Sequence, residues 1–245
     1  MQTPKLRDSK KKQIKDLYPL GELPEATILT IAKWIVYQCA VGKNDITGED
    51  WGDIFAKAIE GEHLARPLGL ADVVHGNLCW SVKSVKDKTP HACKNLRIIS
   101  GRNSPDYSYN IQNPHEDPQA TGTAVLGIWN ERVNIATDNF GRLRTATLIR
   151  NFNKLDFTFF ETEITRFPTN EYRWEVNKNG NLEGYNRRTD EHSFTWQPHE
   201  AQFTIKYNVP DSALRFSVKR PPVFDFEKTI ANLGFDSSWV RFIKP

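Results

Sequence analysis

Residues 69–83 read Gly-Leu-Ala-Asp-Val-Val-His-Gly-Asn-Leu-Cys-Trp-Ser-Val-Lys, and this stretch decides the fold that the sequence predicts. Its two apolar runs are short enough for β-strands. The turn between them, His-Gly-Asn at 75–77, contains Gly and Asn, which favour the positive φ angles of tight hairpins. We therefore predict a β-hairpin over about residues 70–86. Its short turn brings Asp72 on the first strand opposite Lys83 on the second.

Alternation along the second strand places the candidate catalytic side chains on one face and the core side chain on the other. Successive side chains of a strand point to opposite faces, so Ser81 and Lys83 share one face while Val82 points into the core. The Val82 carbonyl is then free to face an ion, and carboxylate and carbonyl oxygens are the ligands that Mg²⁺ prefers. A lysine beside such an ion can orient water or neutralise charge on a phosphate. The hairpin thus predicts metal-dependent hydrolysis of a phosphodiester.

Asp72 followed about ten residues later by Ser81-Val82-Lys83 resembles the PD-(D/E)xK nuclease superfamily, and within it the type II restriction endonucleases. The resemblance covers roughly residues 45–150 and implies an α-β-β-β-α-β core. It also implies that Asp72 is a metal ligand, that the Val82 backbone carbonyl is a second ligand, that Lys83 is the catalytic lysine and that the cofactor is Mg²⁺.

Two positions depart from the family pattern. Residue 71 is Ala rather than Pro, and residue 81 is Ser rather than an acid, although some restriction endonucleases have Ser-x-Lys at this point. The acid that completes the site then has to come from elsewhere. Asp53 and Glu49 on the helix before the hairpin are candidates, and so is Glu131; the spacing does not choose among them.

Two helices precede the hairpin. The first begins after Pro24, with apolar residues at helical spacing from Ile28 to Cys39. The second begins at Thr47, which forms a capping box with Asp50 three residues later. Three further elements follow the hairpin: a buried strand at 96–100, a helix at 123–138 and a strand at 145–150.

The second half of the chain is mostly strands. We predict them within 157–167 and at 172–176, 182–185, 194–196, 203–207 and 214–218, with a short helix at 226–233. The fold class is therefore α/β or α+β: a mixed central sheet flanked by helices, with a β-rich C-terminal extension. We expect a nuclease core with N-terminal helices over 1–165 and a recognition region over 166–245, which can form one continuous domain.

Several polar residues are candidates for contact with DNA. Arg102 and Asn103 follow the strand at 96–100, and such side chains bond guanine and adenine in the major groove. Gln197 and His199 lie between two aromatic strands and form a second candidate reading element. Lys86 suits a phosphate. Other cations are phosphate candidates with an ordinary solvated surface as the alternative: Lys10–Lys12, Lys88, Arg142, Arg144 and Arg150. The net charge of +3 is compatible with such a partner without requiring it.

The cysteines and the hydropathy predict the cellular compartment. Three cysteines without framework spacing favour a reduced cytoplasm, and no apolar run is long enough for a membrane span. His75, Cys79, His91 and Cys93 offer four potential zinc ligands, but their spacing is unlike that of structural zinc sites. A packed strand cysteine is the better interpretation of Cys79. No phosphate-binding loop, Gly-x-Ser-x-Gly motif or His-Glu-x-x-His motif occurs.

The resemblance implies a bacterial, cytoplasmic, Mg²⁺-dependent type II restriction endonuclease that makes sequence-specific cuts in double-stranded DNA. It also implies a cognate DNA methyltransferase as genetic partner. A homodimer would suit a palindromic target, because one chain carries one site and two strands must be cut. Two alternatives stay open: a repair or recombination nuclease of the same superfamily, and a DNA-binding module without catalysis, which Ser81 would permit.

Overall fold

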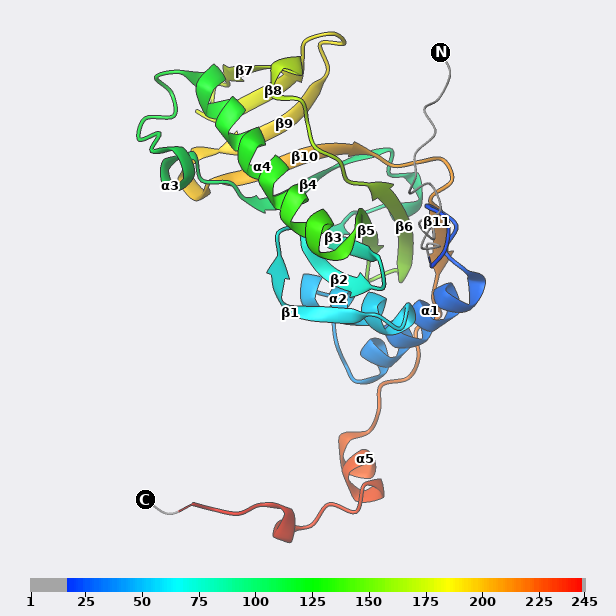
Figure 1. Cartoon of the computed structure of the whole chain (residues 1–245). Helices are drawn as coiled ribbons and strands as arrows, with labels where there is room; N and C mark the ends of the chain where they lie inside the picture. Colours follow the sequence, from blue (N-terminus) through cyan, green and yellow to red (C-terminus); the bar gives the residue numbers. More distant parts are fainter. Residues whose placement is uncertain (1–16, 244–245) are drawn as a thin grey trace, which may run out of the picture.

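Two β-sheets with helices around them make up the fold in a computed structural model, which describes residues 17–243 (Figure 1). Sheet A has the strand order β1-β2-β3-β5-β6-β11, and sheet B has the order β4-β10-β9-β8-β7. The strands of sheet A are β1 (Glu62–Leu68), β2 (Ala71–His75), β3 (Leu78–Lys86), β5 (Arg142–Asn151), β6 (Asp156–Glu163) and β11 (Leu214–Ser217). Those of sheet B are β4 (Asn95–Arg102), β7 (Tyr172–Val176), β8 (Leu182–Asn186), β9 (His192–Gln197) and β10 (Gln202–Asn208). The predicted α+β class is confirmed.

Helices cover both faces of sheet A. One core cluster joins α1 (Glu25–Ala40) and α2 (Gly48–Ala58) to Val73, Trp80 and Val82 of the sheet. A second joins α4 (Pro118–Phe140) to Cys79 on the opposite face. The short helices are α3 (Pro105–Tyr109) and α5 (Phe226–Asn232). Within residues 17–243, no helix combines the length and apolar character that a bilayer span requires.

The predicted elements around the hairpin are present, with one strand assigned to the wrong sheet. Within sheet A the order is α2, β1, β2, β3, α4, β5, and β3 pairs in parallel with β5. The first strand of this series is β1, which the sequence did not reveal. The strand expected at 96–100 is β4, and it belongs to sheet B, where Ile98 pairs with Ile205. It is buried on one face only, since Ile99 between the buried neighbours is exposed.

The two sheets share one core through α4. This helix runs from sheet A toward sheet B (Figure 1), and its buried residues join those of both sheets in the second cluster. Gly122 of α4 lies directly against the Trp174 ring of β7, where a Cβ would come within 2.1 Å. The chain also crosses between the sheets. Strand β4, from the first half of the chain, belongs to sheet B, and strand β11, from the second half, belongs to sheet A. Residue 165 therefore does not separate the sheets.

The helix expected at 123–138 is longer at both ends. It begins at Pro118 because the Asp117 side chain accepts the Ala120 N–H, and Pro suits the first helical turn. Its last residue is Phe140, before Gly141 at a φ of 90°. The preceding helix α3 was not predicted; Ser104 caps it and Pro105 starts it.

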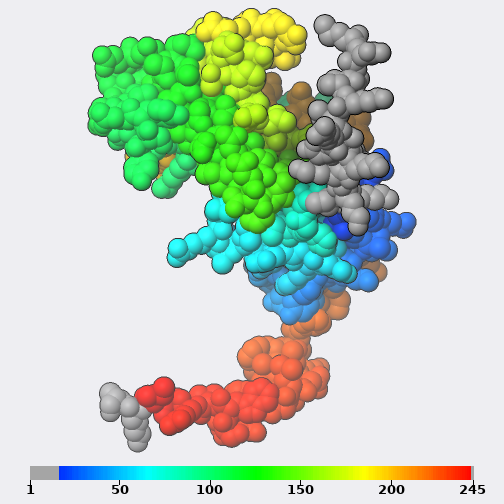
Figure 2. All heavy atoms as spheres, viewed as in Figure 1, coloured from blue at the N-terminus to red at the C-terminus, as the bar shows by residue number. Residues whose placement is uncertain are grey.

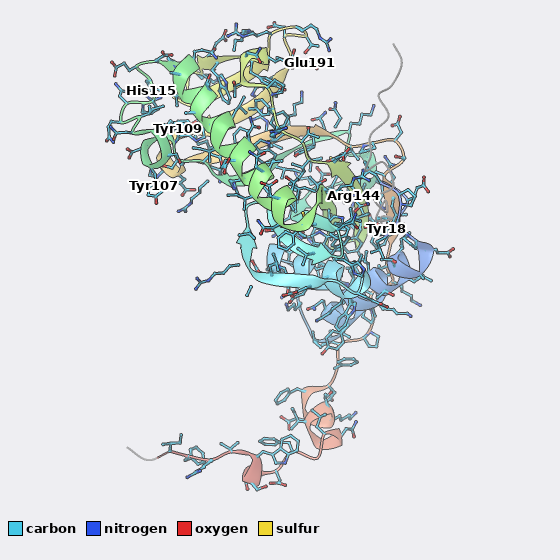
Figure 3. All side chains as sticks on the ribbon, viewed as in Figure 1. Tyr18, Tyr107, Tyr109, His115, Arg144 and Glu191 are labelled. Carbon is cyan, nitrogen blue, oxygen red and sulfur yellow. The ribbon has the colours of Figure 1, made fainter. Side chains whose placement is uncertain are left out.

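Two arginines proposed as phosphate contacts are buried instead. Arg144 lies in a closed cluster where Glu161 accepts hydrogen bonds from Tyr18 and Trp80, with 3.9 Å between the Arg144 and Glu161 side chains. Figure 3 places Tyr18 and Arg144 close together, and the guanidinium stacks over the Tyr18 ring. Arg150 is also buried and is bound by Asp45. Lys10–Lys12 lie outside the described residues.

Candidate active site

The hairpin brings Asp72 and Lys83 together as predicted. Asp72 Oδ2 lies 3.5 Å from Lys83 Nζ, and the two side chains are 20% and 22% exposed. The same oxygen accepts the Val82 backbone N–H at 2.8 Å and the Ser81 hydroxyl at 3.4 Å. Asp72 and Lys83 thus remain partly open to solvent, whereas Ser81 and the Val82 backbone that bond to Asp72 are buried.

Strand register explains the arrangement. The ladder between β2 and β3 ends with Val73 opposite Trp80, so Val82 no longer faces the backbone of β2. The Asp72 side chain takes over as acceptor for its N–H. Val73 and Val82 both pack toward α1 and α2. Their neighbours Asp72, Ser81 and Lys83 therefore lie on the other face of sheet A, beneath α4.

The donor set suits a hard cation that keeps most of its own waters. In an extended strand the N–H and C=O of one residue point to the same side, so the Val82 carbonyl is directed to the same side of β3 as its N–H, which bonds Asp72. One carboxylate, one carbonyl and the Ser81 hydroxyl are oxygen donors, and Mg²⁺ is commonly held by one or two carboxylates together with substrate phosphate. No group of three or more His, Cys, Asp or Glu side chains within residues 17–243 is placed to hold a metal.

Neither upstream candidate for the second acid is brought to Asp72. Asp53 Oδ1 lies 2.8 Å from His63 Nδ1, and Glu49 Oε2 lies 3.9 Å from His63 Nε2. His63 belongs to β1 opposite Val73 and packs against Gly52 of α2, so this trio lies on the α2 face of the sheet. Glu131 is exposed on α4, where Asn134 donates to it.

The structure adds a cation that the sequence did not single out. Arg132 of α4 donates through Nη1 to Asn103 Oδ1 at 3.1 Å and to the Ser100 carbonyl at 3.3 Å. Burial lowers the pKa of this guanidinium, and the nearby Asp72 carboxylate opposes that shift. Gly101 makes room for it, since a Cβ there would come within 2.6 Å of Nη1. A charged residue on a long helix carries no sequence signal that distinguishes this position from a solvated one.

The proposed reading residues gather at one end of sheet B. Arg102 of β4 and Gln197 of β9 are each paired with Gln202 of β10, from opposite sides. His199 is exposed in the 3-10 turn Pro198–Glu200 that joins β9 to β10. Residues about one hundred positions apart in the chain therefore form a single rim, which we call the sheet B rim: Arg102, Gln197, His199 and Gln202.

Asn103 has a different position from the one expected. It is completely buried, its amide donates to the Val125 carbonyl, and its side-chain oxygen accepts from Arg132. Its carbonyl accepts the Trp196 indole N–H. Its amide is therefore not presented to a DNA groove, and the expected base contact is not available. Instead Asn103 connects the sheet B rim, through Arg132, to the surroundings of Asp72.

Lys86 is separated from Lys83 although both lie on β3. Three residues along a strand place it on the opposite face, where its Nζ lies 2.8 Å from Asp45 Oδ2. Asp45 also binds Arg150 through both carboxylate oxygens. Burial works against ionisation of Asp45, but the hydrogen bonds from Arg150 and Lys86 outweigh it and lower its pKa to about 2.

The four potential zinc ligands have other partners. His75 bonds the Glu60 carbonyl, His91 bonds the Phe216 carbonyl, and the Cys93 thiol donates to the Asn95 carbonyl. Cys79 is buried in the second core cluster, and burial raises its thiol pKa to about 12. Cys79 is thus a packed strand residue.

Comparison with known proteins gave no match to a family model, to a curated protein or to a solved structure.

Proposed function

We propose that this chain is a Mg²⁺-dependent type II restriction endonuclease that hydrolyses phosphodiesters of double-stranded DNA at a specific sequence. The observation that carries the proposal is the meeting of Asp72 and Lys83 at 3.5 Å on the α4 face of sheet A, where both side chains remain partly exposed. A second observation supports it: the sheet B rim, with exposed Arg102, adjoins that face through Asn103 and Arg132.

In this proposal each residue of the hairpin has one task. Asp72 and the Val82 carbonyl would hold Mg²⁺, which when bound supplies charge neutralisation at the phosphate and a more acidic water. Lys83 orients the attacking water by donating a hydrogen bond and adds positive charge beside the phosphate. Ser81 donates to Asp72 and keeps its carboxylate in position. The water attacks phosphorus in line with the leaving oxygen.

Binding of DNA in this proposal uses the sheet B rim. Arg102 suits two hydrogen bonds to a guanine edge, and Gln197 and His199 add further contacts in the same groove. We propose a homodimer, because each chain has one candidate site and a duplex has two strands. The genetic partner would be a DNA methyltransferase that protects the host, and the site of action the bacterial cytoplasm.

One observation favours a second candidate, a DNA-binding module without catalysis. Within residues 17–243, Asp72 is the single carboxylate bonded to Ser81, Val82 or Lys83. A bound substrate phosphate would have to supply much of the remaining coordination. A repair or recombination nuclease of the same superfamily uses the same site and differs in reading DNA shape rather than sequence.

Digestion of plasmid DNA with and without Mg²⁺ separates these candidates. Discrete bands support a restriction endonuclease, structure-dependent nicking supports a repair nuclease, and retention of DNA without cutting supports the module. Lys83→Ala should lower the cleavage rate by about 100-fold or more while DNA binding persists. Lys86→Ala is the matched control, because it removes a lysine of the same strand from the other face. Full cleavage by Lys83→Ala would refute the assignment.

A further inference from the structure

The C-terminal arm, defined as residues 223–243, carries large apolar side chains that nothing in the described chain covers. Figure 1 shows it leaving the body below α1, and Figure 2 shows its spheres standing apart from the rest of the molecule. The exposed members are Val223, Phe224, Phe226, Leu233, Phe235, Trp239, Val240, Phe242 and Ile243. Among them, Phe226 is 71% exposed and Trp239 is 62% exposed. Aromatic residues in such numbers mark an interaction surface.

The arm has internal order that suits docking. Asp225 caps α5 by accepting the Lys228 N–H, and Asp236 caps a second short turn, the 3-10 helix Ser237–Trp239. The rings of Phe235 and Trp239 contact each other edge to face at 5.7 Å. These contacts fix the conformation of the arm before a partner binds, which lowers the conformational entropy lost on binding.

The root of the arm is fixed next to the end of α1. The Phe224 backbone N–H donates to the Ala40 carbonyl at 2.7 Å, and a Cβ on Gly42 would lie 3.8 Å from the Val223 side chain. The arm then leads away from the α1 of its own chain (Figure 1). Its starting point is therefore fixed while its apolar side chains remain uncovered.

The helix at this root carries exposed apolar side chains that no other described residue covers. Helix α1 contains only two charged residues, Glu25 and Lys33, and both lie on its exposed face, one turn before and one turn after Leu29. Ile31, Ile35 and Cys39 fill its inner face, whereas Leu29 and Tyr37 on the outer face and Val41 at its end are 53%, 48% and 44% exposed. The exposed face of α1 is thus a mixed surface, with Leu29 and Tyr37 alternating with one acid and one lysine.

We propose that the C-terminal arm docks on the outer face of α1 of a second copy of this chain, in a reciprocal exchange. The arm begins beside the end of α1 of its own chain, and the helix that it is to cover is α1 of the second copy. A two-fold axis close to Ala40 and Phe224 therefore places each arm over the partner's α1 in one operation, and the contact closes as a symmetric dimer. The inference concerns assembly and does not depend on the nuclease activity proposed above.

Charge and size agree with this occupant. Asp225 and Glu227 outnumber Lys228 at the start of α5, while Lys33 of α1 and Lys57, which lies over the Trp34 ring at 4.3 Å, outnumber Glu25 beside the outer face. The length of the arm alone is close to the residues that each partner gives to a standard interface, about 20 to 30. Arm exchange contributes two such contacts to one dimer.

Sedimentation velocity of the full chain over a range of concentrations tests the proposal. We expect a dimer for the unchanged chain and a monomer for Phe235→Ser/Trp239→Ser, with the dissociation constant raised by about 30-fold or more. Tyr107→Ser is the control, because Tyr107 is exposed on α3 at the other side of the molecule (Figure 3) and should leave the dimer intact.

A mixing experiment distinguishes a contact between arm and α1 from association through any other surface. Leu29→Ser/Tyr37→Ser should also be monomeric, since it removes the target face and keeps the arm. An equimolar mixture of the arm variant and the α1 variant should recover a heterodimer, because one intact arm can still meet one intact α1. Circular dichroism melting curves check that both variants remain folded.

The alternatives predict other results. An arm that folds back on its own α1 gives a monomer for the unchanged chain, and a dimer formed elsewhere survives both double substitutions. Either result overturns the proposal, and so does a mixture that stays monomeric. Lys83→Ala should dimerise like the unchanged chain, so a failure of the nuclease assignment and a failure of the arm exchange are seen separately.

Discussion

The Asp72 carboxylate replaces a neighbouring strand for Val82: its Oδ2 accepts the Val82 backbone N–H at 2.8 Å, beyond the point where the β2–β3 ladder ends. The same oxygen lies 3.5 Å from Lys83 Nζ. One atom therefore supports the end of the hairpin and faces the proposed catalytic lysine. Structural and chemical tasks meet at this residue, and suitable substitutions separate them.

Asp72→Asn should abolish Mg²⁺-dependent cleavage while changing stability little. The amide oxygen can still accept the Val82 N–H, but the charge that would hold the ion is gone. Asp72→Ala should also abolish cleavage and should lower the unfolding free energy by about 1 kcal/mol more, because the acceptor is lost as well. Plasmid cleavage and urea denaturation measure the two effects. Equal stability of both variants would contradict the bonding described for Val82.

Arg132→Ala should destabilise the fold by about 1 to 3 kcal/mol, because it removes a donor from the buried Asn103 side chain and the Ser100 carbonyl. Arg102→Ala is the control: its side chain is exposed, and the expected change in stability is within about 0.5 kcal/mol. Urea denaturation gives both values. In a DNA-binding assay the larger effect is expected from Arg102→Ala, which should lose sequence preference. Similar unfolding curves for the two variants would speak against the position assigned to Arg132.

The pairing of Asp45 with Arg150 and Lys86 should make stability depend on pH in the acid range. The pKa of Asp45 is lowered to about 2 in the folded chain, so its contribution is complete above the unfolded value and is lost as pH falls through the folded value. At pH 7 we expect Asp45→Asn to be less stable by about 2 kcal/mol, and this difference should disappear between about pH 4 and pH 2. Urea denaturation as a function of pH measures it.

Asp211→Asn serves as a control for that series, since its side chain is exposed. A constant gap between Asp45→Asn and the unchanged chain from pH 7 to pH 2 would mean that the ionisation of Asp45 does not stabilise the fold.

Two glutamates of β6 should differ sharply in their contribution to stability. Glu161 is buried and accepts hydrogen bonds from Tyr18 and Trp80 beside the buried Arg144. Glu161→Ala removes one carboxylate beside the buried guanidinium and leaves the Tyr18 hydroxyl and the Trp80 indole N–H without this acceptor, which is expected to destabilise by about 3 to 5 kcal/mol. Glu163 lies two residues along and forms a half-exposed pair with Arg142, so Glu163→Ala should change stability by less than about 1 kcal/mol. Thermal melting compares them directly, and similar melting temperatures are the contrary outcome.

Local patterns in the sequence predicted the elements that depend on local physics. The Thr47–Asp50 capping box starts α2, and both of its reciprocal hydrogen bonds form. The Gly-Asn turn and the alternation of 78–86 predicted the hairpin and the common face of Ser81 and Lys83. These features need only neighbouring residues, so a single sequence contains them.

The missed features depend on distant partners or on atypical strands. Strand β1 is an edge strand with mostly exposed residues and contains Pro67, and such strands lack clear alternation. The placement of β4 in sheet B depends on its pairing with β10, which no local pattern encodes. For the site, the burial of Asn103 and the approach of Arg132 both follow from how α4 packs between the sheets.

The hydrogen bonds that hold the backbone of Asn103 have a consequence for the order in which the protein matures during translation. Asn103 takes its fixed position from Trp196 and Ala201, which the ribosome adds roughly a hundred residues after it. A nascent chain that ends before β9 contains Asp72 and Lys83 but lacks Trp196 and Ala201, the two partners that hold the backbone of Asn103 and through it Arg132. The surroundings of Asp72 on the Arg132 side are therefore completed only after residue 201 has been added.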